Sequence, residues 1–365
     1  MVNAFLTQKK GYYYIVINQK DSNGKRKPKW VATHLKVEGN KEKAEVILDE
    51  LKNGDRPLTD LSEILFSDYL LEWLKNVKGT IAVTTYSSYE STVKNIIAPY
   101  FDKLRINIRG LSHPQIQRFY EIQLDRHVSP NTVIRYHAII HRALQHALKR
   151  GVIISNPADL AERPRKEVYH ASCYSIEEAN KLLEVARNST IALPVILALF
   201  YGLRRSEVLG LRWSAIDFDN DTLTINHSVN QSMVDSDYTI TAHDRLKKNS
   251  SFRTLPLIGV VRDALLLERN KNKSSEYVCT DIKGKLISPN YVTQTFSKLI
   301  KKNGLRSIRF HDLRHSCANI LISQRVPLIE VQQWLGHSSI STTADLYSHL
   351  DYSIKLNSAN TIKKN

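Results

Sequence analysis

The stretch NPADLAERPRKEVYHAS, residues 156–172, divides the sequence into two differently patterned parts. It contains prolines and many charged residues without the spacing of a helix or a strand, which is typical of a linker. The 365 residues of the chain exceed what one hydrophobic core usually serves, so two or three domains are expected. A linker at this place predicts separate folding units before and after it.

Before the linker, the sequence changes from strand patterning to helix patterning. Residues 11–37 are rich in aromatic and β-branched residues, which predicts short strands, and residues 40–53 have the spacing of an amphipathic helix. Residues 60–150 show helical spacing throughout. The last of these helices is expected to begin with Ser129 as its N-cap and Pro130 in its first turn.

Beyond the linker, helices and strands are mixed. Ser175 with Glu178 three residues later forms a capping box that predicts the start of a helix. Helices are expected to about residue 215, then strands in LTINHSV, YTITAHD and FRTLPL, then helices again to about residue 350. The predicted fold class is multidomain α+β, with a small N-terminal β-sheet plus helix, an all-α domain, and a mainly α domain containing a small antiparallel sheet.

The charge of the chain indicates a polyanionic partner. The formal net charge is +16 and the sequence pI is about 9.6, and the positive residues are spread through every segment. Lysine and arginine gain affinity for nucleic acid by releasing counterions from phosphates, so DNA or RNA is favoured over simple solubility. Two groups of basic side chains are candidate DNA contacts, although each could also be an ordinary solvated surface: Lys25, Arg26, Lys27 and Lys29 among the N-terminal strands, and Arg135, Arg142 and Lys149 along one helix.

Other classes of protein and site are disfavoured. No apolar run reaches the roughly 18 residues of a membrane span, and the N-terminus lacks the layout of a signal peptide, so a cytoplasmic protein is expected. Cys173, Cys279 and Cys317 lie far apart, which favours reduced thiols over disulfides or zinc ligands. A calcium-like run starting at Asp217 lacks the glycine and the final glutamate that such a loop needs, so no metal site is predicted.

Two apolar stretches carry charged residues at helical spacing. In YGLRRSEVLGLRW, predicted to be one helix over residues 201–213, Arg204 and Glu207 face the same way. In RFHDLRHSCANIL, His311 and Arg314 are likewise three residues apart. Each pair alone could be a solvated pair or a core histidine. Together they place cations in apolar surroundings, where a missing partner is costly, and guanidinium groups suit the oxygens of a phosphate.

Three further stretches complete a set that can act on a phosphodiester. His337 follows Gly336, and RLKKNSSFRTLPL places Lys247 and Lys248 at the tip between two strands. Tyr347 lies in TTADLYSHL. Most of the 17 tyrosines are expected simply to bury a ring. With arginines to stabilise charge and a lysine or histidine to move protons, however, a tyrosine can form a covalent phosphate intermediate.

The motifs GLRRSE, LKKNSSFRTLPL, HDLRH, LGHSS and TTADLYSHL, in this order, resemble those of the tyrosine recombinases. The similarity is strongest to the integrases of temperate phages and integrative conjugative elements. It implies a catalytic set of seven residues. In it, Arg204 and Arg314 clamp the phosphate, and the acidic Glu207 supports Arg204. Two histidines, His311 and His337, the lysine Lys247 and the nucleophile Tyr347 complete the set.

Two parts of the resemblance leave alternatives open. The family often has PKTKSSRRTIPL where this chain has LKKNSSFRTLPL, so the catalytic lysine could be Lys248 in place of Lys247. The family does not demand chemistry from Asp312 and His315 of the HDLRH motif, and both are interpreted as structural supports.

The resemblance also implies an organisation and an activity. The expected parts are an arm-DNA-binding domain at 1–56, a helical core-binding (SAM-like) domain at 57–156, a linker at 157–172, a catalytic domain at 173–350 and a C-terminal tail at 351–365. The tail is a candidate for packing against a neighbouring protomer.

The implied enzyme is an integrase that inserts, and also excises, a mobile element through a 3′-phosphotyrosine link. The link conserves the phosphoester energy, so neither ATP, a metal nor another cofactor is expected. The implied partners are double-stranded DNA with core and arm sites, three further copies in a homotetramer, and accessory bending or excision factors, in a bacterial cytoplasm. A type IB topoisomerase and a non-catalytic DNA-binding protein remain alternatives, although the basic N-terminal module and the tail favour recombination.

Overall fold

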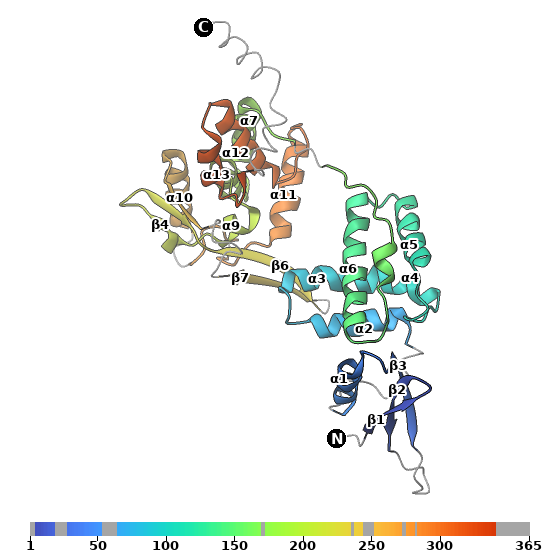
Figure 1. Ribbon diagram of the computed structural model, residues 1–365. Coiled ribbons are helices and arrows are strands. Elements are labelled where there is room, and N and C mark those ends of the chain that lie inside the picture. The colour runs from blue at the N-terminus through green and yellow to red at the C-terminus, as the bar shows by residue number, and fades with distance from the viewer. Residues whose placement is uncertain are drawn as a thin grey trace, which may run out of the picture. The chain divides into compact units, whose positions relative to one another are not determined.

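Two compact units, Met1–Val168 and Tyr169–Asn365, make up the protein in this computed structural model. Helices dominate and the sheets are small and antiparallel, in agreement with the predicted class (Figure 1). The residues that the structure describes are 4–18, 28–52, 64–168, 172–234, 237–243, 252–271, 275–281 and 283–340.

The first unit begins with a three-stranded antiparallel sheet of order β1–β2–β3 and a helix, α1. Their bounds are β1 Ala4–Lys9, β2 Tyr12–Ile17, β3 Lys29–Lys36 and α1 Lys41–Lys52. Side chains alternate between the faces of a strand, so Ile15 and Ile17 share a face, and both are buried in one core with Ala44 and Ile47 of α1. The predicted strands and helix are present, and β1 was not predicted.

Five α-helices follow in the described part of the same unit, with one π-helical turn between the second and third of them. They are α2 Phe66–Val77, α3 Val83–Thr92, α4 Ala98–Lys103, α5 His113–Asp125 and α6 Pro130–Lys149, with the π turn at Val93–Ile97. The Oγ of Ser129 accepts the backbone N–H of Thr132, and Pro130 opens α6, as predicted. A short 3₁₀-helix, Pro157–Leu160, follows α6.

The second unit surrounds its core with seven α-helices among the residues described. They are α7 Ile176–Ala186, α8 Ala192–Tyr201, α9 Arg205–Gly210, α10 Gly259–Lys271, α11 Pro289–Lys302, α12 Asp312–Ser323 and α13 Leu328–Leu335. The predicted capping box of α7 is present: Ser175 Oγ accepts the Glu178 N–H at 3.2 Å, and the Glu178 carboxylate accepts the Ser175 N–H at 2.9 Å.

The strands of the second unit form two sheets where one was predicted. One sheet has the order β4–β5–β8, and among the described residues β6 pairs with β7 alone. The bounds are β4 Ile216–Asp217, β5 Thr222–Ile225, β6 Ser228–Val234, β7 Asp237–His243 and β8 Arg253–Pro256. The segment LTINHSV is therefore broken between β5 and β6 at Asn226 and His227. The break lets Ser228 lie directly against Gly210 of α9, where a Cβ on Gly210 would meet the Ser228 backbone at 2.6 Å.

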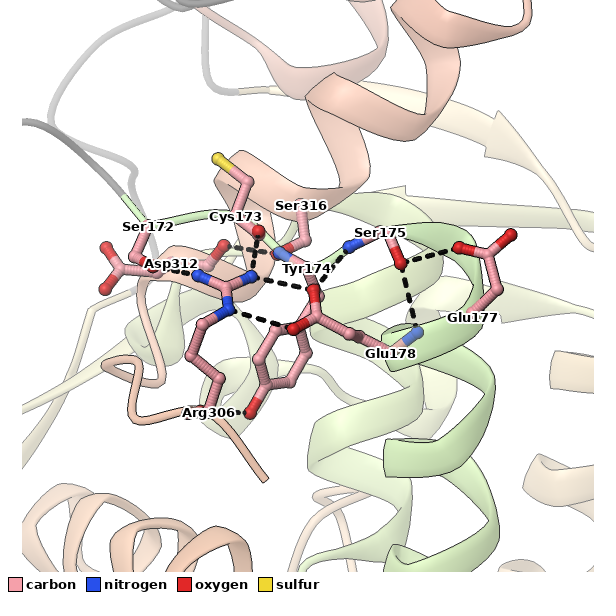
Figure 2. Close-up of polar contacts among 9 residues, drawn as sticks. All are labelled: Ser172, Cys173, Tyr174, Ser175, Glu177, Glu178, Arg306, Asp312 and Ser316. Atoms are coloured by element: carbon pink, nitrogen blue, oxygen red, sulfur yellow. Dashed lines mark hydrogen bonds and ion pairs between the residues drawn. The ribbon is translucent and has the colours of Figure 1, made fainter. Parts of the chain in front are cut away.

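A polar cluster around Arg306 anchors the first residues of the second unit (Figure 2). The Arg306 guanidinium donates to both oxygens of Glu178, at 2.9 and 2.7 Å, and to Ser172 and the Cys173 carbonyl. The Tyr174 hydroxyl donates to the Arg306 carbonyl at 2.6 Å, and its backbone N–H donates to Ser316 of α12 at 2.9 Å. The chain is thus tied to α12 where it enters this unit, and α12 carries part of the site described next.

Candidate active site

Gly202 ends α8 and turns the chain into α9. Its φ of +59° lies in the left-handed region that glycine adopts most easily, so α8 stops at Tyr201 and Arg204 becomes the N-cap of α9. The prediction of one continuous helix over 201–213 is therefore wrong. The turn still leaves Arg204 and Glu207 together, because a residue at the N-cap lies beside the third residue of its helix.

The carboxylate of Glu207 is buried between two arginines. Its side chain is 2% exposed, and Oε1 accepts from Arg204 Nη1 at 2.6 Å while Oε2 accepts from Arg253 Nη2 at 3.2 Å. Burial alone would raise the pKa of Glu207, but the charges of Arg253 and Arg204 outweigh it and the pKa is lowered. Glu207 is consequently ionised and holds both guanidinium groups.

Arg253 was not predicted as a site residue. It lies on β8 on the same side as Leu255, in a strand whose side chains alternate between buried and exposed. The alternation of FRTLPL places an arginine on the apolar face of the strand, and this is the signal that could have identified it.

Arg314 occupies the third position of α12 and is almost fully buried, with 2% of its surface exposed. Nη1 donates to the Gly202 carbonyl at 2.5 Å, and Nε donates to His337 Nε2 at 3.3 Å. Nη2 is buried and has no hydrogen-bond partner among the described residues. Burial and the charge of Arg204 lower the pKa of Arg314 to about 9, so it is still a cation at neutral pH.

His337 lies immediately after the left-handed Gly336 that ends α13. Its N–H donates to the Gln332 carbonyl at 3.1 Å, and the preceding Gly336 carbonyl accepts from Arg204 Nη2 at 3.5 Å. Burial and the charges of Arg314 and Arg204 lower the pKa of His337 to about 3. Since the arginine Nε can only donate, His337 Nε2 is the acceptor and the proton of its neutral ring is on Nδ1.

His311 and its neighbours form the start of α12. The His311 ring keeps a solvent-accessible side and packs edge-to-face on His315, with centroids 5.3 Å apart. Burial of the imidazole and the nearby His315 and Arg314 lower the pKa of His311. Asp312 is buried and accepts from Arg309, through the backbone N–H at 2.8 Å and Nη2 at 2.7 Å. Asp312 therefore stabilises the first turn of the helix.

Among the described residues, the site has an excess of positive charge. Arg204, Arg253 and Arg314 surround the carboxylate of Glu207, and Arg204 is still 34% exposed. Arg204 and Arg314 both contact the Gly336–His337 segment, so their guanidinium groups converge from α9 and α12. Two guanidinium groups that converge with one buried N–H unused provide donors for the oxygens of a phosphate.

The remaining candidates fall into two groups. The lysines 247 and 248, Tyr347 and the basic residues 25–27 lie outside the described residues, and Lys29 is the first residue of β3. Arg135, Arg142 and Lys149 are exposed on α6, as the seven-residue spacing predicts.

The two arginines of this α6 group also contact α3. Arg135 donates to Ser88 at 3.0 Å, and Arg142 donates to the Tyr89 hydroxyl at 3.3 Å with its guanidinium 5.8 Å from the ring centre.

The described part of the chain offers neither a metal-binding cluster nor a membrane-spanning helix. Histidine, cysteine, aspartate and glutamate side chains form no group of three that could bind a metal ion there. None of the helices there has the length and apolar character required to cross a membrane.

Comparison with known proteins places these features in a family. The profile of the phage integrase family matches residues 174–353, and that of the phage integrase N-terminal SAM-like domain matches residues 65–124. A tyrosine recombinase XerC-like protein of Caldanaerobacter subterraneus subsp. tengcongensis is 26% identical over 97% of this chain and 96% of its own length. The ICEBs1 integrase of Bacillus subtilis (strain 168) is 24% identical over 73% of each chain.

Solved structures show the same fold. The Tn1549 transposon integrase in complex with a circular intermediate DNA superposes with a TM-score of 0.68 over 82% of this chain and 99% of that chain, at 16% identity. A lambda integrase tetramer bound to a Holliday junction gives a TM-score of 0.64 over 94% of each chain, at 18% identity. With both family profiles matching in order along one sequence, the chain belongs to the phage integrase family of tyrosine recombinases, which are site-specific DNA strand transferases.

Proposed function

We propose that this recombinase integrates and excises a mobile genetic element, with Tyr347 as the nucleophile. The observation that carries the proposal is the convergence of Arg204 and Arg314 on the Gly336–His337 segment, with the Arg314 Nη2 group unused. A buried cation with a free donor beside a half-exposed one is suited to an anion that enters from solvent. The scissile phosphate of DNA is such an anion.

Each proposed residue has one task in the reaction. The Tyr347 oxygen attacks the phosphorus while its proton passes to the neutral ring of His311; the bond between the tyrosine oxygen and the 3′-phosphate forms, and the bond to the 5′-oxygen breaks. Lys247 donates the proton that the leaving 5′-oxygen takes up, and His337 orients Arg314. Arg204 and Arg314 stabilise the negative charge that grows on the non-bridging oxygens. The 5′-hydroxyl of a partner strand then attacks the phosphotyrosine and releases the enzyme.

The neutral ring of His337 supports an orienting role. With its proton on Nδ1 and with Nε2 accepting from Arg314, the ring holds the guanidinium in place. A neutral imidazole does not add to the positive charge of the site, so the charge that remains is that of the arginines.

The proposed parts of the chain follow the expected order. The segments are an arm-binding module at 1–56, a core-binding domain at 57–156, a linker at 157–172, a catalytic domain at 173–350 and a tail at 351–365. The excess of 16 positive charges supports arm and core contacts to double-stranded DNA.

The relatives and fold neighbours support two parts of the proposal, namely that the substrate is a mobile element and that the working assembly is a tetramer. One relative is the integrase of ICEBs1, one fold neighbour is a transposon integrase with DNA, and another is a tetramer on a Holliday junction. By analogy, we propose that four copies of this chain act on two DNA segments in the bacterial cytoplasm, together with DNA-bending or excision factors.

A nicked suicide substrate tests the proposed nucleophile. A nick beside the cleavage site lets the short leaving strand diffuse away, so a covalent protein–DNA adduct accumulates. The wild-type protein is expected to form this adduct in EDTA, and Tyr347→Phe is expected to form none because it lacks the attacking oxygen. Adducts that persist in Tyr347→Phe, or cleavage that requires a metal, would overturn the proposal.

A second assay separates recombination from DNA relaxation alone. Two different duplexes that carry the attachment site are mixed, and joined products are measured. Recombinant products are expected. Relaxation of supercoiled DNA without any joining of the two duplexes would indicate the type IB topoisomerase alternative instead.

A further inference from the structure

Arg253 is a buried arginine at the point where three elements of the site meet. It is 8% exposed, and on β8 it pairs with Ile225 of β5, on the inward face of the sheet. A buried charge is costly unless hydrogen bonds and an opposite charge compensate it. Its position therefore needs an explanation in terms of its partners.

Arg253 has partners on two other elements. Nη2 donates to Glu207 Oε2 of α9 at 3.2 Å, and Nε donates to the Trp334 carbonyl of α13 at 2.9 Å. The opposite oxygen of Glu207 holds Arg204. A continuous chain of hydrogen bonds thus runs from Arg204 through Glu207 and Arg253 to the end of α13.

The end of α13 is the segment that presents His337. Trp334 is followed by Leu335, which ends the helix, and then by Gly336 and His337. The carbonyl end of a helix carries a partial negative charge that a guanidinium stabilises. By binding the Trp334 carbonyl, Arg253 fixes the place from which the chain turns to bring His337 onto Arg314.

Arg253 also determines how much of the Arg204 charge is available to a ligand. A carboxylate that pairs with Arg204 alone neutralises it. Because Glu207 is shared between Arg204 and Arg253, the group of three retains one positive charge. Arg253 is itself too buried to reach DNA, so that charge acts at the half-exposed Arg204.

We infer that Arg253 is a positioning residue for strand transfer, which aligns Arg204 through Glu207 and His337 through the end of α13 without touching DNA. The inference rests on the proposed roles of Arg204 and His337. It gives β8 a role in positioning the site residues, in addition to its place in the chain after Lys247.

The test compares Arg253→Met and Arg253→Lys with wild type under single turnover at saturating nicked DNA. Arg253→Met is expected to slow adduct formation roughly 10- to 100-fold, the effect of a displacement of about 1 Å at reacting groups. DNA affinity, measured by titration of intact duplex, is expected to change little, because backbone contacts made over the whole basic surface dominate it. The rate of adduct formation in Arg253→Lys is expected to lie between those of wild type and Arg253→Met, because one ammonium cannot bind both Glu207 and the Trp334 carbonyl as a guanidinium does.

A matched control separates alignment from a general loss of stability. Arg212 is also partly buried and paired with a carboxylate, Glu276 at 3.1 Å, and it lies over Tyr277 outside the site. Arg212→Met is expected to lower the melting temperature while the rate of adduct formation stays at the wild-type value. A wild-type rate in Arg253→Met, or an equal loss of rate in Arg212→Met, would overturn the inference. If Arg253→Met does not fold, a wild-type rate of adduct formation in Arg253→Lys would overturn the inference.

An NMR titration measures the pKa of the His337 ring, which a purely structural role of Arg253 would leave unchanged. The Arg253 charge is one of those that lower the pKa of His337, after burial, Arg314, Arg204 and His315. The pKa is expected to rise in Arg253→Met and to stay low in Arg253→Lys; an unchanged value in Arg253→Met counts against the inference. Failure of the proposed function has a different signature, since wild type and Tyr347→Phe would then behave alike.

Discussion

At the scale of single residues, the environment of His337 keeps its ring neutral. Its surface is 8% exposed, and the arginines at 204 and 314 lie around it. Protonation would bury a further positive charge and would convert Nε2 from an acceptor into a donor facing the Arg314 Nε–H. The folded protein therefore resists protonation of this histidine, and that resistance must appear in the stability of the second unit.

The predicted consequence is a loss of stability in mild acid. The pKa of His337 is lowered by burial and by Arg314 from 6.5 to about 3, so below pH 6.5 the unfolded chain binds a proton that the folded chain does not. This linkage lowers the free energy of unfolding as pH falls from 6.5, by up to about 2 kcal/mol at pH 5. His337→Gln keeps an acceptor but cannot titrate. Urea unfolding at pH 7 and pH 5 should show a smaller loss in His337→Gln, and equal losses would contradict the prediction.

The sequence indicated most residues of the site but not how they are held. Arg204, Glu207, Arg314 and His337 were all predicted, and the structure brings them together. They could be predicted because each lies in a short motif whose residue types suit phosphate chemistry. Arg253 was missed because its partners are 46 and 81 residues away in the sequence, and such pairings depend on tertiary packing.

At the scale of elements, the turn between α8 and α9 determines where both arginines lie. The Gly202 carbonyl accepts from Arg314, and the two following residues lead to Arg204 at the start of α9. The same glycine packs under α13, since a Cβ there would collide with the Leu335 side chain and would contact Arg314. One residue without a side chain therefore lets α9, α12 and α13 approach each other.

We predict that Gly202→Ala destabilises the second unit. The left-handed backbone costs a non-glycine residue about 1 kcal/mol, and the collision with Leu335 adds roughly 1–3 kcal/mol. Thermal unfolding should show a clearly lower melting temperature, together with slower adduct formation because Arg314 is displaced. Gly259→Ala is the matched control, since a Cβ at the start of α10 meets nothing within 4 Å. Similar stability of the two variants would contradict this account of the turn.

Elements that depend on local signals could be predicted, and those that depend on distant pairing could not. The starts of α6 and α7 followed from Ser129 with Pro130 and from the Ser175–Glu178 box, because caps involve neighbours in sequence. The break between α8 and α9 was missed because the apolar spacing continues across Gly202. The division into two sheets was missed because β5 pairs with β8 and β6 with β7, a choice that the strand pattern alone does not specify.

At the scale of the whole molecule, charge governs how the protein binds its substrate. The arginines of the site account for only a small part of the net charge of +16. The exposed basic residues of α6 contribute to that excess and are candidates for contacts with DNA, but they differ in their contacts within the protein. Arg135 and Arg142 also bind side chains of α3, so replacing them would change packing as well as charge. Lys149, exposed in the last turn of α6, allows a cleaner test of its contribution to DNA binding.

We predict that Lys149→Ala weakens DNA binding mainly at low salt. Each phosphate contact contributes about 0.9 to the slope of log affinity against log salt concentration, so losing one contact should reduce the magnitude of the slope by about that amount. Fluorescence titrations of a core-site duplex at several salt concentrations measure it. Lys75→Ala is the control, because Lys75 is likewise exposed in the last turn of a helix, α2, outside the seven-residue series. A reduced slope in both variants would mean that charge acts through the general field of the protein, whereas a change in Lys149→Ala alone assigns this end of α6 to the DNA backbone.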